Sequence, residues 1–116
     1  MADLGAPLIL RNLFRDSNLN EIPWKPYREG IEIHELYATP GGSRAALLRY
    51  SPGACLPRHF HIGYEHIFVL YGAQTDDASD YQSGTLLINP PGSSHAVTSE
   101  KGCIVLAIWE RAVRFD

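Results

Sequence analysis

The sequence lacks a long apolar run, and this absence excludes a membrane-spanning helix. Its longest purely apolar run extends from Cys103 to Trp109, whereas a helix that crosses a bilayer needs roughly 18 or more apolar residues. The first residues also lack the basic segment of a secretory signal peptide, since Asp3 and Arg11 bracket only a short apolar stretch. We therefore expect a cytoplasmic protein that does not interact with a membrane.

Positive charge and cysteine are both scarce. The 10 lysines and arginines are outnumbered by 13 aspartates and glutamates, which gives a formal net charge of -3, and a nucleic-acid partner would favour a basic surface. The two cysteines, Cys55 and Cys103, are too few for a disulfide framework. We expect them to be small buried apolar residues in an intracellular chain, and we expect no nucleic-acid partner.

A long amphipathic helix is the third missing feature. The 8 prolines and 10 glycines divide the 116 residues into pieces of strand length, a spacing typical of β-sandwiches and barrels. The sequence thus predicts an all-β fold, a small antiparallel β-barrel or jelly-roll sandwich. We expect one domain over residues 1–116, with the core barrel at about 28–114 and residues 1–27 as a strand or arm. The expected strands are 30–39, 43–50, 56–61, 64–71, 81–82, 85–89, 95–98 and 104–113, with room for a short strand at 8–10.

Three histidines and one glutamate form the pattern that carries chemistry. His59 and His61 stand two residues apart on a predicted strand, so their side chains point to one face while Phe60 points to the other. Glu65 opens the next predicted strand and can turn back toward the two imidazoles. His95 begins a later strand just past a rigid Pro-Pro-Gly turn.

Three imidazoles and one carboxylate are a donor set that suits a divalent transition metal. Four protein ligands would leave open positions on an octahedral ion, but none on a tetrahedral zinc. The prediction is one divalent metal ion per chain, held by His59, His61, Glu65 and His95. Iron or zinc are the first candidates, and manganese or nickel also suit these ligands.

The spacing of these ligands resembles the two sequence motifs of the cupin family. The first motif is matched, with gaps of five, one, three and six residues, by Gly53, His59, His61, Glu65 and Gly72. The second is matched by Gly84, Pro90, Gly92 and His95, although Ser99 stands near the place where the family usually has an asparagine. That asparagine is not a ligand in the family, so the resemblance still implies a cupin barrel with a metal held by the three histidines and the glutamate.

A finer resemblance is to the ChrR-like cupins, which also form the C-terminal half of some anti-sigma factors. It rests on Trp24-Lys25-Pro26 ahead of Gly30-Ile31, and on the segments 44–49 (RAALLR) and 57–61 (PRHFH). Some diketone-cleaving dioxygenases are similar. The resemblance implies a homodimer. Residues 1–23 are too short to supply the helical, zinc-binding part with which those anti-sigma factors grip a sigma factor.

The alternation beyond Glu65 predicts a pocket wall. It places Ile67, Val69 and Tyr71 on the metal side, where they would make an apolar wall with one hydroxyl, and simple filling of the core is an equally good interpretation. His66 then faces the opposite side, toward the surface or an interface.

Two further groups of polar residues receive an unremarkable interpretation. We expect His34 to be structural or exposed. We also expect Asp76, Asp77 and Asp80 to form a solvated loop, because they lie in a polar stretch.

Functions of different classes stay open at this point. The chain is either a metal-dependent, dioxygenase-like enzyme acting on a small enolisable carbonyl compound, or a metal-binding sensor that reports a ligand or oxidant through a partner. A third interpretation is a pocket that has lost activity and keeps a metal for stability. In the enzyme, Glu65 is the candidate base, and no separate nucleophile–base pair is present near the motifs. The partners expected are a small molecule and a second copy of the chain.

Overall fold

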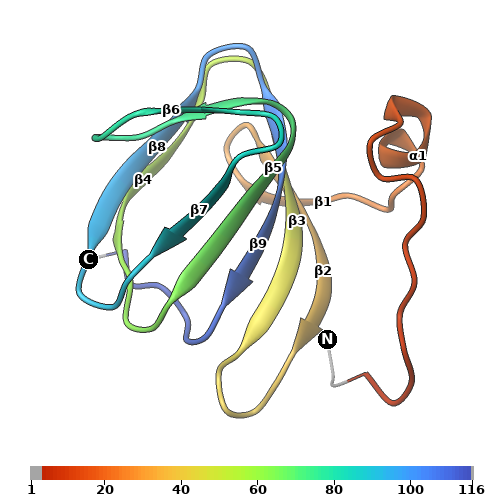
Figure 1. The fold of residues 1–116 in the computed structure, drawn as a ribbon, viewed down its shortest axis with the longest axis horizontal. Helices are drawn as coiled ribbons and strands as arrows, with labels where there is room; N and C mark the ends of the chain where they lie inside the picture. Colours follow the sequence, from red (N-terminus) through yellow and green to blue (C-terminus); the bar gives the residue numbers. More distant parts are fainter. Residues whose placement is uncertain (1–3, 116) are drawn as a thin grey trace.

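The computed structural model describes residues 4–115, and its regular secondary structure is almost entirely antiparallel strands that curl into a barrel (Figure 1). The predicted all-β barrel is therefore confirmed. Among these residues, no helix has the length and apolar character needed to cross a bilayer. The elements are α1 (Asp16–Asn20), β1 (Lys25–Arg28), β2 (Ile31–Ala38), β3 (Arg44–Tyr50), β4 (Ala54–Phe60), β5 (Glu65–Thr75), β6 (Asp80–Gln82), β7 (Leu86–Asn89), β8 (Ser94–Ser99) and β9 (Cys103–Trp109).

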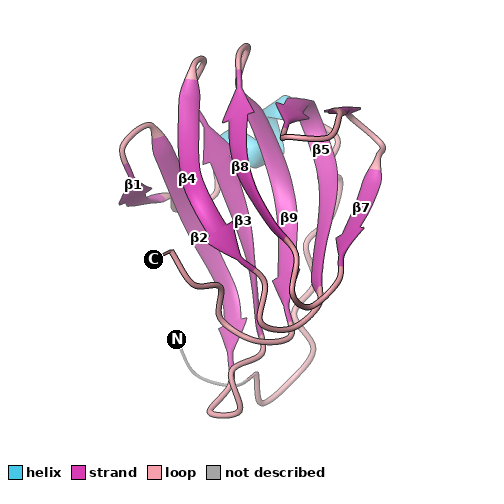
Figure 2. Ribbon diagram, turned by 90° about the vertical axis from the view of Figure 1, so that its left-hand side faces the viewer, coloured by secondary structure: helices cyan, strands magenta, loops and turns pink. Residues whose placement is uncertain are grey.

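Strand β5 joins the two layers of the barrel. The strand order is β1-β2-β3-β9-β5-β8-β4, and β6 and β7 also pair with β5. The first part of β5 pairs with β9 and β7, whereas its end pairs with β6 and β8. Figure 2 shows β4 and β8 in front of the layer formed by β2, β3 and β9. The side chains between the two layers form the interior of the barrel.

A bulge in β5 interrupts the alternation of its side chains. The pairing of β5 with β9 shifts between Val69 and Tyr71, so Leu70 is an extra residue on β5. Gly72 follows with a φ of 74°, and a Cβ atom there would lie 2.2 Å from the carbonyl oxygen of Gly102. Only glycine can occupy this position without displacing the neighbouring backbone.

Two apolar clusters lie on opposite faces of the main layer. The interior cluster fills the barrel between the layers and includes Leu48, Ile67, Val69, Val97 and Val105. The outer cluster lies where α1 covers the outside of β3, β5 and β9, and its buried members are Leu19, Leu47, Leu70 and Ile104. The main layer is thus apolar on both faces, which explains the continuous apolar run in β9.

The N-terminal region and the end of β9 differ from the sequence-based expectations. Residues 8–10 form no strand, a five-residue helix α1 stands in a stretch expected to be loop, and β1 precedes the first expected strand. Strand β9 ends at Trp109 rather than at residue 113. It ends there because neither antiparallel neighbour extends further. Trp109 pairs with Arg44, the first residue of β3, and with Glu65, the first residue of β5.

Candidate metal centre

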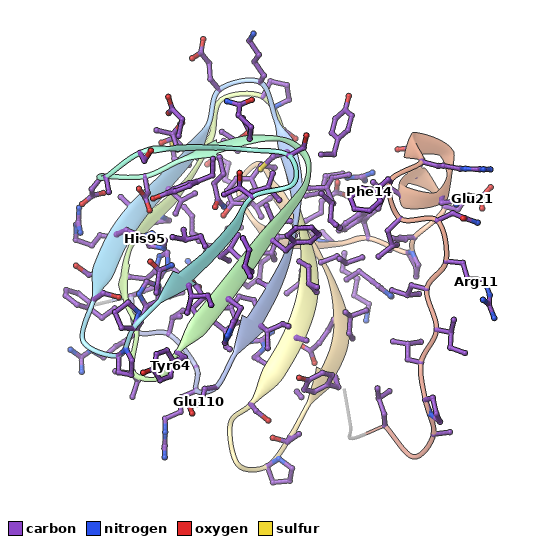
Figure 3. All side chains as sticks on the ribbon, in the orientation of Figure 1. Arg11, Phe14, Glu21, Tyr64, His95 and Glu110 are labelled. Atoms are coloured by element: carbon purple, nitrogen blue, oxygen red, sulfur yellow. The ribbon has the colours of Figure 1, made fainter. Side chains whose placement is uncertain are left out.

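The four predicted ligands meet inside the barrel. One ligand atom from each of His59, His61, Glu65 and His95 lies within 4.8 Å of all the others, and all four residues are buried. They come from three strands and one turn: His59 from β4, Glu65 from β5, His95 from β8, and His61 from the turn after β4. Figure 3 shows His95 pointing from its strand into the barrel.

Pairing between β4 and β8 brings the histidines together. His59 is the direct partner of His95, and a register shift between Leu56 and His59 precedes this pair. Pro57 lies in the shifted segment, on a strand at the end of the sheet order, where a missing N–H breaks no ladder. The backbone N–H of His61 donates to the carbonyl of Ser93 at 2.9 Å. The chain after β4 is therefore tied to the turn that precedes β8.

In His59 and His61 the Nδ1 atom, which points away from the cluster, donates a hydrogen bond to a nearby oxygen. Nδ1 of His59 lies 3.0 Å from the carbonyl oxygen of Pro57, which can only accept. Nδ1 of His61 lies 2.8 Å from Oγ of Ser93. That hydroxyl uses its one proton toward the Pro90 carbonyl, at 2.7 Å, and so accepts from His61. Both rings therefore carry a proton on Nδ1, and Nε2 is the ring nitrogen that each turns toward the cluster.

Asp76 is the acceptor for the Nδ1 proton of His95. Its Oδ2 lies 2.9 Å from Nδ1 of His95, while its Oδ1 accepts from the hydroxyl of Tyr81 at 2.9 Å and from the N–H of Ala78 at 2.9 Å. Burial alone would raise the pKa of Asp76, but the hydrogen bonds from His95, Ala78 and Tyr81 outweigh it and hold this pKa below its usual range. An ionised Asp76 thus accepts the Nδ1 proton of His95.

The expected solvated loop is therefore wrong for Asp76, whose side chain is only 5% exposed. Asp77 and Asp80 are exposed, as expected. Asp77 pairs with Arg58 across the barrel rim and accepts from the N–H of Ala96 at 3.2 Å. The loop is fastened to β4 and β8 by these contacts, which join residues far apart in the sequence.

Glu65 is held by two side chains that are not ligands. Nδ2 of Asn89 donates to Oε1 at 2.9 Å, and Nε1 of Trp109 donates to Oε2 at 2.7 Å. Burial alone would raise the pKa of Glu65, but its contact with His61 outweighs this effect and holds that pKa below its usual range. Glu65 is consequently a carboxylate deep in the barrel, with both oxygens fixed in place.

The arrangement fits a divalent cation. Nε2 of His61 is buried, lies 3.0 Å from Oε1 of Glu65, and has no hydrogen-bond partner among the described residues. With Nδ1 donating to Ser93, a neutral ring would set the Nε2 lone pair against a carboxylate oxygen, which is unfavourable unless a cation lies between them. Burial also lowers the pKa of His59, which keeps that ring neutral and able to ligate. The cluster could thus hold a metal ion, whose identity the donor set leaves open.

The predicted pocket wall is only partly correct. Ile67 lines the interior cavity next to His59, Glu65 and His95. Val69 is fully buried in the interior cluster. Tyr71, by contrast, lies on the outside of the barrel and is 49% exposed. The bulge at Leu70 reverses the alternation of β5, and this reversal corrects the assignment of Tyr71 to the metal side.

His66 and His34 do not join the metal cluster. His66 pairs with Ile88 of β7 and Ile108 of β9, is half-buried and lies on the outward face of β5. His34 is half-buried on β2 and lines a shallow outer depression with Lys25. Both placements agree with the expectation from the alternation of their strands.

Sequence reasoning missed the residues that orient the ligands. These are Asp76, Asn89, Ser93 and Trp109, which come from four separate places in the chain. Ser93 lies in the turn next to His95, so its position in the second motif was an available signal. The other three offered none, because their contacts depend on how the strands are paired.

Comparison with known proteins identifies the family. A family model for the ChrR cupin-like domain matches residues 17–111. This chain belongs to the ChrR cupin-like family. No curated protein sequence matches it.

Solved structures agree with membership of the ChrR cupin-like family. A chain in the crystal structure of Rhodobacter sphaeroides SigE in complex with the anti-sigma ChrR is 29% identical, with a TM-score of 0.72, and the match covers 79% of this chain and 51% of that one. The present chain thus spans about half the length of that relative. An acetylacetone dioxygenase from Acinetobacter johnsonii is 16% identical with a TM-score of 0.78, covering 99% and 81% of the two chains. A putative acetylacetone dioxygenase from Methylibium petroleiphilum is 14% identical with a TM-score of 0.82, covering 100% and 84%. At these identities the two dioxygenases support the fold alone.

Proposed function

We propose that His59, His61, Glu65 and His95 hold one divalent metal ion, and that the protein is a dioxygenase-like enzyme acting on a small enolisable carbonyl compound. The observation that carries the proposal is the buried cluster of four ligands, with lone pairs turned inward, beside an interior cavity. Iron or zinc are the first candidates, and manganese or nickel also suit the donors. Similarity to two acetylacetone dioxygenases makes a carbonyl substrate reasonable.

The residues around the site would have separate roles. The bound ion would supply Lewis-acid or redox chemistry. Asp76 and Ser93 keep the proton of their histidine on Nδ1, and Asn89 and Trp109 hold the carboxylate in one orientation. Glu65 is the only carboxylate among the cavity-lining residues, so it is the group that would take a proton from a substrate carbon.

A metal-binding sensor is the second candidate. It is favoured by the similarity to a chain of the complex between SigE and the anti-sigma ChrR. In this alternative the barrel would report a ligand or an oxidant through a protein partner, and redox-inert zinc would suit it better than iron. The proposal places the protein in the cytoplasm, where Cys55 and Cys103, both free thiols in the structure, would stay reduced.

A homodimer is part of the proposal and is supported by the N-terminal arm, residues 4–14. The arm runs alongside the barrel (Figure 1), and its Phe14 ring meets Phe68 of β5 edge-on, with 6.4 Å between the ring centroids. It carries apolar side chains that its own barrel does not bury, since Ile9 is 63% and Phe14 is 69% exposed. A partner barrel could cover them. Light scattering after size exclusion should give twice the chain mass, and Ile9→Ser should shift the protein toward the monomer.

The direct test of the proposal is metal content by plasma mass spectrometry, on protein purified without a metal-affinity tag. We expect about one metal ion per chain, lost in His59→Ala and in His95→Ala. His66→Ala is the matched control, because His66 faces away from the cluster, and it should keep the metal. Iron together with oxygen uptake in the presence of diketones would support the enzyme, whereas zinc without turnover would support the sensor. No metal above the level of the two ligand variants would refute both.

A further inference from the structure

The interior cavity contains two buried polar side chains that the metal cluster does not use. Besides His59, Glu65 and His95, the cavity is lined by Tyr50 and Gln74. Tyr50 is 3% exposed and Gln74 is 2% exposed. Most of the other lining residues are apolar, such as those of the interior cluster. Buried polar groups on an apolar wall are the usual means of orienting a ligand.

The β5 bulge is what turns Gln74 inward. Strict alternation from Glu65 would place residue 74 on the outer face, together with His66. The extra residue at Leu70 reverses that order, so the side chain at 74 enters the barrel just as that of Tyr71 leaves it. The bulge thus turns the Tyr71 hydroxyl away from the interior and turns the Gln74 amide into it.

The polar atoms of Tyr50 and Gln74 can make more hydrogen bonds than the one between them. Gln74 is a hydrogen-bonding neighbour of the Tyr50 phenol. An amide offers two N–H donors and one acceptor oxygen, more than one phenol can use. Burial raises the pKa of Tyr50 far above that of an ordinary phenol, so its O–H remains a donor at any physiological pH.

The charge of the cavity limits what it can bind. No lysine or arginine is among the residues that line it, and its one acidic group is Glu65. A bound divalent ion and the Glu65 carboxylate would together carry a net charge of +1, which one anionic group of a ligand would neutralise. A buried second negative charge without a cationic partner would be strongly unfavourable. Phosphate esters and dicarboxylates therefore do not fit.

We propose that Tyr50 and Gln74 form a second anchor point, which binds a distal oxygen of a small, neutral or singly charged ligand whose first oxygen lies at the metal cluster. This inference rests on the proposed function, because it takes the four-residue cluster as the first anchor. It makes Tyr50 and Gln74 specificity-determining residues. It also narrows the ligand to a compact molecule with two separated oxygens, an apolar body and at most one negative charge.

Such a ligand must displace part of the present wall. The cavity volume is about 20 Å³, enough for roughly one water molecule. Phe115 is one of its lining residues, with its ring centroid 5.5 Å from that of His59 and the Arg28 guanidinium 3.7 Å from its own ring centroid. The preceding residue, Arg114, exchanges two backbone hydrogen bonds with Phe60, of 2.7 and 3.0 Å, and its guanidinium lies 5.5 Å from the centroid of the Phe60 ring. A ligand larger than one water molecule would therefore have to displace Phe115 from the His59 ring.

The test uses the visible absorption of the cobalt(II)-loaded protein, titrated with ligand pairs that differ only in a distal oxygen. The pairs are butanoate with 4-hydroxybutanoate, and pentanoate with 4-oxopentanoate. We expect the wild-type protein to bind each distal-oxygen ligand about tenfold more tightly than its partner, as one added hydrogen bond to a buried group implies. Propylphosphonate, a dianion at high pH, should not perturb the spectrum.

Substitutions then separate the second anchor from the metal. In Tyr50→Phe and Gln74→Leu the tenfold preference should fall to about twofold or less, while the affinities for butanoate and pentanoate stay as in the wild type. Tyr71→Phe is the matched control, because the same hydroxyl is removed from the outside of the barrel, and it should keep the full preference. Cooperative thermal unfolding of each variant would show that it is folded.

The outcomes distinguish the two proposals. If cobalt(II) gives no bound spectrum, the proposed metal centre fails and the second anchor fails with it. If cobalt(II) binds and the wild type shows no preference for the distal oxygen, or no response to any of the acids, the second anchor alone is wrong. An unchanged preference in both Tyr50→Phe and Gln74→Leu would also overturn it.

Discussion

The interior and outer clusters lie on opposite faces of the same strands but are built differently. The outer cluster is made of aliphatic and aromatic side chains, with one side-chain hydrogen bond, from Nε1 of Trp24 to the carbonyl of Leu19 at 2.9 Å. The interior combines apolar residues with four buried ionisable ligands and their hydrogen-bonded partners. Apolar contacts tolerate small shifts, whereas converging lone pairs do not. We therefore expect the outer cluster to affect the stability of the fold but not metal binding. We expect the interior to link stability to metal binding.

The largest expected effect is that of metal on thermal unfolding. A metal that binds only the folded state adds about 3–4 kcal/mol when its free concentration is several hundred times its dissociation constant. For a domain of this size the melting temperature should rise by roughly 10 °C, as measured by calorimetry with zinc or iron and with chelator. His61→Ala should abolish the rise. A rise of equal size in that variant would contradict the assignment of the site.

Damage to the outer cluster should lower stability without affecting the metal. Leu19 is 1% exposed and packs beneath α1, so Leu19→Ala should cost about 2–3 kcal/mol by urea unfolding. Metal content per chain should remain that of the wild type, and the shift on metal binding should persist. Loss of metal in this variant would mean that the two clusters are not independent.

Asp76 should affect the metal more weakly than a ligand does. Replacing it with asparagine removes the negative charge that fixes the Nδ1 proton of His95, and a change of this kind typically weakens metal binding by about tenfold or more. Competition with a chromophoric chelator would measure it. Asp80→Asn is the control, since the Asp80 carboxylate accepts a hydrogen bond from the Thr75 hydroxyl and, among the described residues, none from a ligand histidine. Equal dissociation constants for Asp76→Asn and the wild type would refute the role of Asp76.

The smallest expected effect is a difference in thiol reactivity between the two cysteines. The expectation that both cysteines are buried is wrong for Cys55, which is exposed. Cys103 lies in the interior cluster, as expected, and burial raises the pKa of its thiol to about 11. At pH 8 only about one Cys103 in a thousand is a thiolate, and that fraction grows as the pH rises. Ellman's reagent should therefore label one thiol per chain quickly and the second only in denaturant. Fast labelling of both would show that the interior opens readily.

The sequence was most informative where structure is local. Alternation and turn residues predicted most of the strands, and the spacing of His59 and His61 placed them on one face. Local patterns failed at Tyr71 and at Asp76. In the first case a bulge, stabilised by the close approach of Gly72 to another strand, reversed the alternation. In the second a polar loop was folded back against a histidine nineteen residues away in sequence.

The sequence by itself determined the fold class, the family and the four residues that meet in the barrel, because strand periodicity and ligand spacing are properties of short segments. The tertiary structure alone decided which groups surround those residues. It assigned Asp76 to His95, Asn89 and Trp109 to Glu65, and Gln74 to the cavity. Each of these contacts joins segments whose relative register is set by strand pairing and by one extra residue in β5. Such long-range register depends on the packing of the whole barrel, which no local pattern encodes.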